Sequence, residues 1–167
     1  NHVCIDCILE GRDTRTTVML RNIPNRVDVE QFIDMLNEYA AGEYDFTYLR
    51  IDFHTNNNVG YAFINFISDA GLLSFLYGVD GRQWARWNSN KVARVSYATI
   101  QGRDSLIQKF RNSSVMFEKE EFRPQLWYSR ENCDVSHPLG TKEAFPRCNN
   151  QGQLNRSIAN AAHQGKF

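Results

Sequence analysis

Alternating aromatic residues in the octapeptide VGYAFINF, residues 59–66, are the first feature of the chain that could do chemistry. Successive side chains of a strand point to opposite faces, so Tyr61 and Phe63 share one face and the aliphatic Ile64 lies on the other. A half-buried strand normally keeps its solvent face polar. Rings on that face are therefore expected either to be covered by another part of the chain or to stack against a flat ligand.

Groups that could bind a metal ion or act in catalysis are scattered. Cys4 and Cys7 form a Cys-x2-Cys pair, and Cys133 with His137 forms a Cys-x3-His pair, which are ligands that zinc accepts. The pairs are far apart in the sequence, so separate unligated thiols are expected, and no metal or other cofactor is predicted. No nucleophile lies in a recognisable motif, so no catalytic residue is assigned and the chain is not expected to be an enzyme.

Composition and charge limit the classes of protein to which the chain can belong. Its 167 residues are 42% hydrophobic, enough for one cored domain with extensions. The 19 Lys and Arg residues balance 19 Asp and Glu residues, which argues against nucleic-acid binding by bulk electrostatics and favours stacking and hydrogen bonds. No membrane-crossing run or signal-peptide pattern is present in the sequence, so no membrane association is expected and a reducing intracellular compartment is favoured.

Hydrophobic periodicity predicts two helices and four strands in the order β-α-β-β-α-β. The strands are predicted at residues 17–23, 46–53, 59–66 and 92–98, and the helices follow the capping residues Asp28 and Ser68 or Asp69. This is the ferredoxin-like α+β pattern, in which right-handed crossovers place both helices on one face of a four-stranded antiparallel sheet. Tyr61 and Phe63 would then lie on the open face.

The residues after the fourth strand differ in composition before and after about Ser129. A third helix is predicted near residues 103–112, with Leu106, Ile107 and Phe110 on one side, and apolar residues continue to about residue 128. From Ser129 the chain is rich in Asn, Gln, Ser and Gly and is expected to be a flexible polar tail. The predicted division is therefore residues 1–13 as an N-terminal extension, 14–100 as the domain, 101–128 as a C-terminal helix with an apolar extension, and 129–167 as the tail.

Two of these segments resemble the paired motifs of the RNA recognition motif. VGYAFINF matches the octamer of that family except that Val59 replaces a basic residue, and VMLRNI (residues 18–23) matches the hexamer except that Met19 replaces an aromatic residue. The resemblance covers about residues 14–100. It implies that the rings of the open face stack on the bases of single-stranded RNA.

Further segments are similar to one branch of the family, the Mei-two-like RNA-binding proteins, which regulate meiosis. The similar segments are RTTVMLRNIPNR (15–26), YDFTYLRIDF (44–53), NNVGYAFINF (57–66), SYATIQG (96–102), RNSS (111–114) and RPQLWYS (123–129). This resemblance implies an RNA-binding domain of a meiotic regulator. It also implies location in the nucleus and the cytoplasm, with the nucleus favoured.

Strand alternation and the resemblance together assign an RNA-binding site. Tyr61 and Phe63 are expected to stack on bases, Met19 to contact a base through its thioether, and Tyr48 to add a ring. The assigned residues are Met19, Arg21, Tyr48, Arg50, Val59, Tyr61, Phe63, Ser96, Ala98 and Gln101. In this assignment the two arginines replace the basic residue lost at position 59, and the last three residues read base edges with side-chain or backbone groups. A single β-bulge would reverse the faces on which these assignments depend.

Three alternatives remain open at this stage. The C-terminal helix could cover the open face. The domain could be a degenerate RNA recognition motif used for protein binding or self-association, with protein partners also possible at the C-terminal extension, although a monomer is expected for a fragment of this kind. An acylphosphatase-type enzyme shares the topology, but its phosphate-binding loop is poorly matched by RNIPNR (21–26), which has no glycine.

Overall fold

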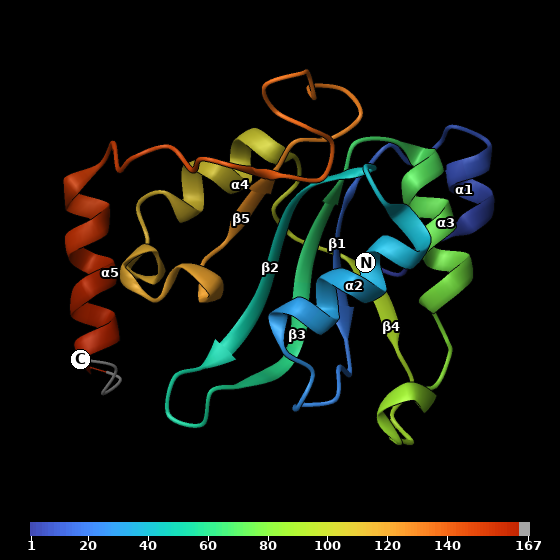
Figure 1. The fold of residues 1–167 in the computed structure, drawn as a ribbon, viewed down its shortest axis with the longest axis horizontal. Helices are drawn as coiled ribbons and strands as arrows, with labels where there is room; N and C mark the ends of the chain where they lie inside the picture. The colour runs from blue at the N-terminus through green and yellow to red at the C-terminus, as the bar shows by residue number, and fades with distance from the viewer. Residues whose placement is uncertain (164–167) are drawn as a thin grey trace.

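A computed structural model describes residues 1–163, in which one antiparallel sheet is packed between helices (Figure 1). The sheet has six strands in the order β4-β1-β3-β2-β5-β6. The strands are β1 (Thr17–Arg21), β2 (Tyr44–Asp52), β3 (Asn57–Phe66), β4 (Arg94–Tyr97), β5 (Gln125–Trp127) and β6 (Lys142–Glu143). The helices are α1 (Ile5–Leu9), α2 (Val29–Ala40), α3 (Asp69–Val79), α4 (Arg103–Phe110) and α5 (Gln151–His163), with 3-10 turns η1 (Ala85–Trp87), η2 (Ser114–Phe117) and η3 (Glu120–Phe122). Among residues 1–163, no helix combines the length and apolar character needed to span a bilayer.

The predicted ferredoxin-like core, β1-α2-β2-β3-α3-β4, is confirmed. A capping box starts α2, since Asp28 accepts a hydrogen bond from the Gln31 N–H and the Gln31 side chain accepts one from the Asp28 N–H. Ser68 caps α3 in the same position. Both helices pack on one face of the sheet, where the main hydrophobic core includes Leu20 and Ile64 at 0% exposure.

Close packing of α2 against α3 depends on a glycine. A Cβ atom at Gly78 would lie 2.2 Å from the Tyr39 ring, so a larger residue would force the ring to move. The absence of a side chain at this position lets the two helices cover the sheet as one layer.

The pairing of β2 with β3 is irregular at two places, between Tyr44 and Phe46 and, at a β-bulge, between Leu49 and Ile51. The register passes from Leu49 opposite Ala62 to Ile51 opposite Asn58, so the extra residues of β3 lie across from Arg50. Gly60 lies in the bulge with φ +107°, a conformation that other residues rarely adopt. Despite the bulge, Tyr61 and Phe63 remain on the face opposite the α2–α3 layer.

The C-terminal part of the chain is folded over residues 129–163, and the expectation of a flexible tail is wrong for them. The RPQLWYS segment forms β5, which extends the sheet beyond β2, and β6 pairs with β5 in turn. The Trp127 indole N–H donates a buried hydrogen bond to Thr47 Oγ1 at 2.9 Å. Helix α5 buries Leu154 and Ala161. Residues 164–167 of the expected tail lie outside the described part of the chain.

The N-terminal extension packs at the opposite edge of the sheet. His2 forms an isolated antiparallel bridge with Ser96 of β4, and the Tyr97 N–H donates to the Asn1 carbonyl. Val3 and Ile8 are buried in the main core. Residues at the start of the chain therefore cover the β4 edge, which would otherwise be free to pair with another strand.

Candidate nucleic-acid interface

The face of the sheet opposite α2 and α3 is organised in rows of residues that lie side by side on neighbouring strands. The central row contains Ser96, Met19, Phe63 and Tyr48, from β4, β1, β3 and β2. A second row contains Arg94, Arg21 and Tyr61, and Arg50 joins it across the bulge. Strand alternation therefore placed the expected residues of these rows on the correct face.

The second row combines an aromatic ring with basic side chains. Arg50 Nη1 donates a hydrogen bond of 2.8 Å to Tyr61 Oη. The Tyr61 and Phe63 rings meet edge to face, with centroids 5.7 Å apart, and both side chains are partly exposed. Arg21 and Arg50 are exposed, and Arg21 Nε lies 3.3 Å from Ser96 Oγ. This arrangement offers ring surface with positive charge next to it.

Helix α4 covers the β2 side of the same face. Phe110 stacks on Phe46 at 5.6 Å and meets Tyr48 edge to face at 5.2 Å. Tyr48 is 8% exposed, and burial raises the pKa of its hydroxyl to about 12. The predicted helix with Leu106 and Phe110 on its packed side is confirmed, but the expected extra stacking ring of Tyr48 is covered by it.

Gln101 serves the fold rather than an open surface. The Gln101 carboxamide accepts hydrogen bonds from the N–H groups of Thr16 and Thr17 and donates to the carbonyls of Thr17 and Ala98. All four bonds are to the backbone, so this side chain has no free capacity to read a base edge. Ala98 is 6% exposed, but it lines the space between the sheet face and the C-terminal segment. The polar residues that follow β4 therefore fix the path of the chain into α4.

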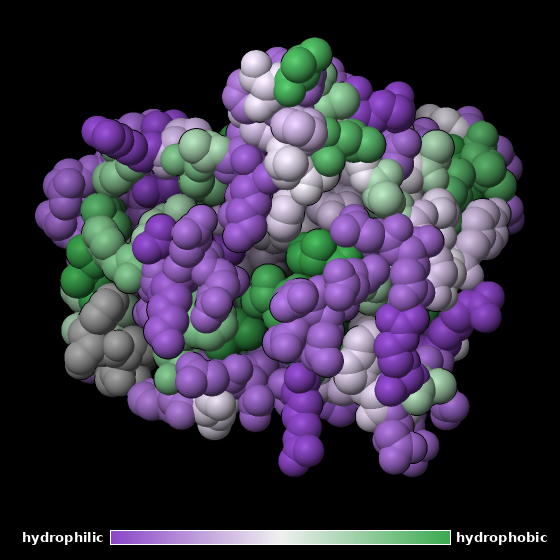
Figure 2. Space-filling view, in the orientation of Figure 1, coloured by the Kyte–Doolittle hydropathy of each residue, from purple (hydrophilic) through white to green (hydrophobic). Residues whose placement is uncertain are grey.

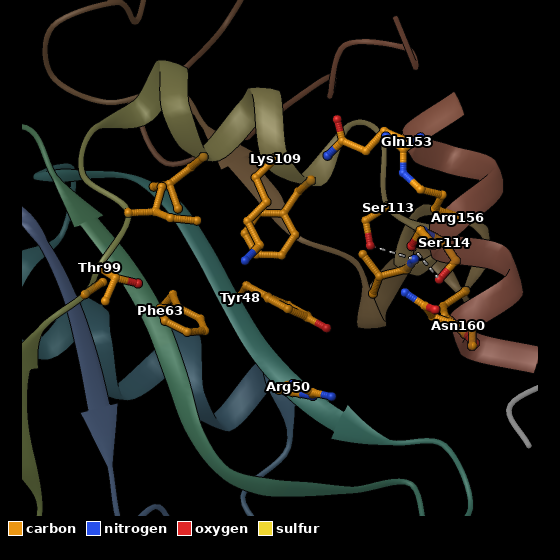
Figure 3. Close-up of a pocket in the computed structure, with 18 of the residues that line it drawn as sticks. Tyr48, Arg50, Phe63, Thr99, Lys109, Ser113, Ser114, Gln153, Arg156 and Asn160 are labelled. Atoms are coloured by element: carbon orange, nitrogen blue, oxygen red, sulfur yellow. Dashed lines mark hydrogen bonds between the residues drawn. The ribbon is translucent and has the colours of Figure 1, made fainter. Parts of the chain in front are cut away.

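A groove of about 570 Å³ lies between the open part of the sheet face and the C-terminal segment (Figure 3). Tyr61, Phe63 and Arg50 line its sheet side. The opposite side is lined by the end of α4, the start of η2 and one face of α5, including Lys109 and Arg156. In Figure 3 Tyr48, Lys109 and Asn160 point into the space between the two sides, whereas Arg156 runs along α5 toward Gln153.

Three basic residues outside the expected site belong to this surface. Lys109 and Arg156 line the groove, and Arg94 extends the second row on β4. Arg94 could have been found from the sequence, because it lies two positions before Ser96 and shares its face. Lys109 and Arg156 could not, because only the folding of α4 and α5 onto the sheet brings them there. Val59 is 40% exposed but does not line the groove.

A second groove, of about 500 Å³, lies on the other side of the sheet between α2, β2 and η3. Its charged residues are Asp28, Glu30, Asp34, Glu120, Glu121, Arg123 and Lys142, so acidic side chains outnumber basic ones. Ile33 and Phe122 line it and are partly exposed. Figure 2 shows hydrophobic surface in a hollow near the centre of this face, surrounded by hydrophilic residues.

The two pairs of possible zinc ligands do not come together as a metal site. Cys4 Sγ accepts a hydrogen bond from the Cys7 N–H, and His137 Nδ1 lies 3.1 Å from Asp134 Oδ1. Across residues 1–163, no three His, Cys, Asp or Glu side chains are close enough together to hold a metal ion.

The sheet, its two covering helices and the aromatic pair on β3 define an RNA recognition motif, a class of RNA-binding domain. Within that class, the chain belongs to the Mei2-like family, and the family model described as RNA recognition motif 2 matches residues 15–111.

The relatives support this assignment over most of the chain. Identity is 46% over 162 residues to "Meiosis protein mei2" of Schizosaccharomyces pombe, 44% over 142 residues to "Protein MEI2-like 2" of Oryza sativa subsp. japonica, and 42% over 146 residues to "Protein MEI2-like 4" of Arabidopsis thaliana. These alignments cover 96%, 85% and 87% of this chain but 21%, 16% and 16% of the relatives. The chain thus spans about a fifth or less of the length of the relatives it matches.

Solved structures of RNA recognition motifs are similar at lower identity. The Rna15 RRM with bound RNA (GU) has a TM-score of 0.47 and 21% identity, covering 57% of this chain and 96% of that chain. The Sxl-lethal protein/RNA complex has a TM-score of 0.43 and 21% identity, covering 54% of this chain and 50% of that chain.

Proposed function

We propose that this chain binds single-stranded RNA on the part of the sheet face that α4 leaves open. The observation that carries the proposal is the partly exposed Tyr61–Phe63 pair, with Arg50 hydrogen-bonded to one ring. Unpaired bases can stack on such rings, whereas bases in a duplex are already stacked on each other. Met19, beside Phe63 in the central row, adds a polarizable contact surface.

The basic side chains of the second row have a separate role in this proposal. Arg21 and Arg50 are exposed beside Tyr61, where they can approach the phosphates of a strand whose bases lie on the rings. In this proposal they replace the basic residue of the motif whose position Val59 occupies. Stacking fixes the bases and the arginines hold the backbone, so no catalytic step is proposed.

The biological setting that we propose is regulation of meiosis. Its support is the 46% identity to a protein named for meiosis and the similarity to several MEI2-like proteins. A location in the nucleus and the cytoplasm, with the nucleus favoured, is proposed on the same resemblance. Imaging of the tagged full-length protein in dividing and meiotic cells tests this location, and exclusion from the nucleus in both would refute the favoured part.

Replacement of Phe63 by alanine tests the RNA-binding site. Because stacking contributes about 1–3 kcal/mol per base, Phe63→Ala should weaken binding of a labelled mixed-sequence RNA by at least about fivefold in fluorescence anisotropy. The matched control is Tyr77→Ala, which removes a 56%-exposed ring from α3 on the other side of the sheet. Equal affinity of folded Phe63→Ala and the native chain would refute the role of Phe63.

A second candidate function is protein binding or self-association through the sheet face. The observation that favours it is the packing of Phe110 over Phe46 and Tyr48, which reduces the face available to a nucleic acid. Titration with a broad pool of single-stranded RNAs at two salt concentrations separates the candidates. Absence of binding across the pool, together with a concentration-dependent oligomer in sedimentation experiments, would favour this second function.

A further inference from the structure

The groove above the sheet has two chemically different walls (Figure 3). The sheet wall presents the Tyr61 and Phe63 rings with Arg50. The other wall comes from residues that follow the four-stranded core, and it combines apolar residues such as Leu106, Phe110 and Val115 with polar and basic ones. Its polar and charged members are Lys109, Ser113, Ser114, Glu118, Gln153, Arg156, Ser157 and Asn160.

The basic residues of the groove carry uncompensated charge. Three basic residues, Arg50, Lys109 and Arg156, and one acidic residue, Glu118, line the groove. Within residues 1–163, none of the three basic residues forms an ion pair. Elsewhere, arginines such as Arg86 and Arg130 are paired with glutamates. Arg50, Lys109 and Arg156 are exposed to solvent, and cations gathered in one groove attract an anionic ligand.

The helix that carries Arg156 is fixed by partly buried polar contacts. Asn112 is 0% exposed, and its Oδ1 accepts hydrogen bonds from the N–H groups of Asn149 and Asn150 at 2.9 and 3.0 Å. Asn150 Oδ1 in turn accepts from the Gln153 N–H in the first turn of α5. The Ser114 N–H donates to Ser157 Oγ at 2.8 Å. The RNSS segment (111–114) thus determines where the polar face of α5 lies.

We propose that the C-terminal segment is the second wall of the RNA-binding site, and that Lys109 and Arg156 bind the phosphates of the strand whose bases stack on Tyr61 and Phe63. This inference rests on the proposed function and extends it to residues that follow the four-stranded core. The sugar–phosphate backbone of a strand lies beside its bases, so cations on the facing wall meet phosphates when bases occupy the sheet wall. The groove therefore binds a single strand from both sides.

Salt dependence of RNA affinity tests the inference in the full chain. We expect Lys109→Gln/Arg156→Gln to lower affinity for a labelled mixed-sequence RNA by at least about fivefold near 0.1 M salt, and to reduce the slope of log K against log salt by about 1.4, since each single-strand phosphate contact contributes about 0.7. The charge-preserving Lys109→Arg/Arg156→Lys should keep the native slope. The control Arg12→Gln/Arg86→Gln removes two charges from exposed ion pairs outside the groove and should leave the slope unchanged.

The outcomes separate this inference from the function on which it rests. Failure of the native chain to bind any RNA would overturn the proposed function. Weaker binding by Phe63→Ala, with native affinity and slope for Lys109→Gln/Arg156→Gln, would overturn the inference alone. A slope reduced equally by the control would also overturn it, because the effect would then come from total charge. Thermal melts of the double variants verify that each is folded.

Discussion

The basic groove on the sheet's open face and the acidic groove beside α2 are built from opposite faces of the same strand, β2. Tyr48 and Arg50 of β2 line the groove on the sheet's open face, whereas Thr47 and Leu49 line the groove beside α2. Both grooves have similar volumes, about 570 and 500 Å³. They differ in charge, because basic side chains predominate in the first and acidic side chains in the second.

This difference shows why the net charge of the chain is a poor guide to its ligand. A formal charge of zero conceals a basic groove and an acidic groove on opposite sides of one sheet. An RNA strand near the surface experiences the local charge, because the Debye length at physiological salt is only about 8 Å. The acidic side would repel a strand, so the charge distribution favours binding on one face.

The largest expected effect is on stability, and it comes from removing the ring of Phe110, the α4 residue that covers the β2 side of the open sheet face. Phe110→Ala should lower the free energy of unfolding by about 3 kcal/mol, because the buried ring packs on Phe46 and Tyr48. Phe122→Ala, in the acidic groove, should cost only about 1 kcal/mol, because Phe122 is partly exposed. Urea denaturation measures both. Equal losses of unfolding free energy for the two variants would mean that Phe110 and Phe122 pack equally well on their respective faces of the sheet.

The next largest effect concerns the C-terminal segment, which forms the second wall of the basic groove. Asn112→Ala removes the acceptor of two backbone N–H groups near the start of α5 and should destabilise that segment by about 2 kcal/mol. Hydrogen exchange of the α5 amides should then accelerate by about thirtyfold, while exchange in β1 and β3 stays slow. Asn155→Ala is the control, because this position is exposed and, within residues 1–163, its side chain bonds only to Gln151. Unchanged protection in α5 would show that Asn112 does not fix this wall.

Charge reversal compares the two grooves directly. Arg50→Glu should weaken RNA binding by about tenfold or more at low salt, because it removes a cation beside Tyr61 and adds a repulsive charge. Glu121→Lys, in the acidic groove, should change affinity by less than about twofold, because an exposed charge beyond the Debye length is largely screened. Fluorescence anisotropy measures both. Similar changes for the two variants would place the RNA elsewhere or make its binding nonspecific.

Much of the core was predictable because its signals are local. The Asp28 capping box, the alternation along β2 and β3, and the apolar side of α4 each depend on residues within a few positions of one another. These signals also placed Tyr61 and Phe63 on the correct face, even though a bulge lies next to them. Alternation survived because β3 pairs with β1 in unbroken register from Tyr61 to Asn65.

The remaining features were not predictable because they depend on distant partners. Asparagine-rich residues after Ser129 look like a solvated tail, but Asn149 and Asn150 hydrogen-bond to the buried Asn112, far away in the sequence. The sequence predicts that Gln101 can contact a base, but in the structure its carboxamide makes four hydrogen bonds to the backbone. Composition cannot distinguish a polar side chain that faces water from one that satisfies another segment's backbone.

The smallest expected effect concerns the ion pair of Arg130 with Glu43, which lines neither the basic nor the acidic groove. A change there should affect stability without affecting RNA binding. Arg130 donates two hydrogen bonds to the Glu43 carboxylate, and these bonds hold the pKa of Glu43 below its usual value of 4.5. The lowered pKa means that the pair stabilises the fold above about pH 4.5, and that this stabilisation is lost as the pH falls through the pKa of Glu43 in the folded chain. The Arg130 side chain is 59% exposed, so the contribution of the ion pair to the free energy of unfolding should be below about 1 kcal/mol.

Arg130→Gln should therefore be slightly less stable than the native chain in urea at pH 7, and the difference should shrink as the pH falls below 4.5. RNA affinity should stay native at pH 7, and a loss comparable to that of Arg50→Glu would mean that the RNA surface extends beyond the basic groove to Arg130.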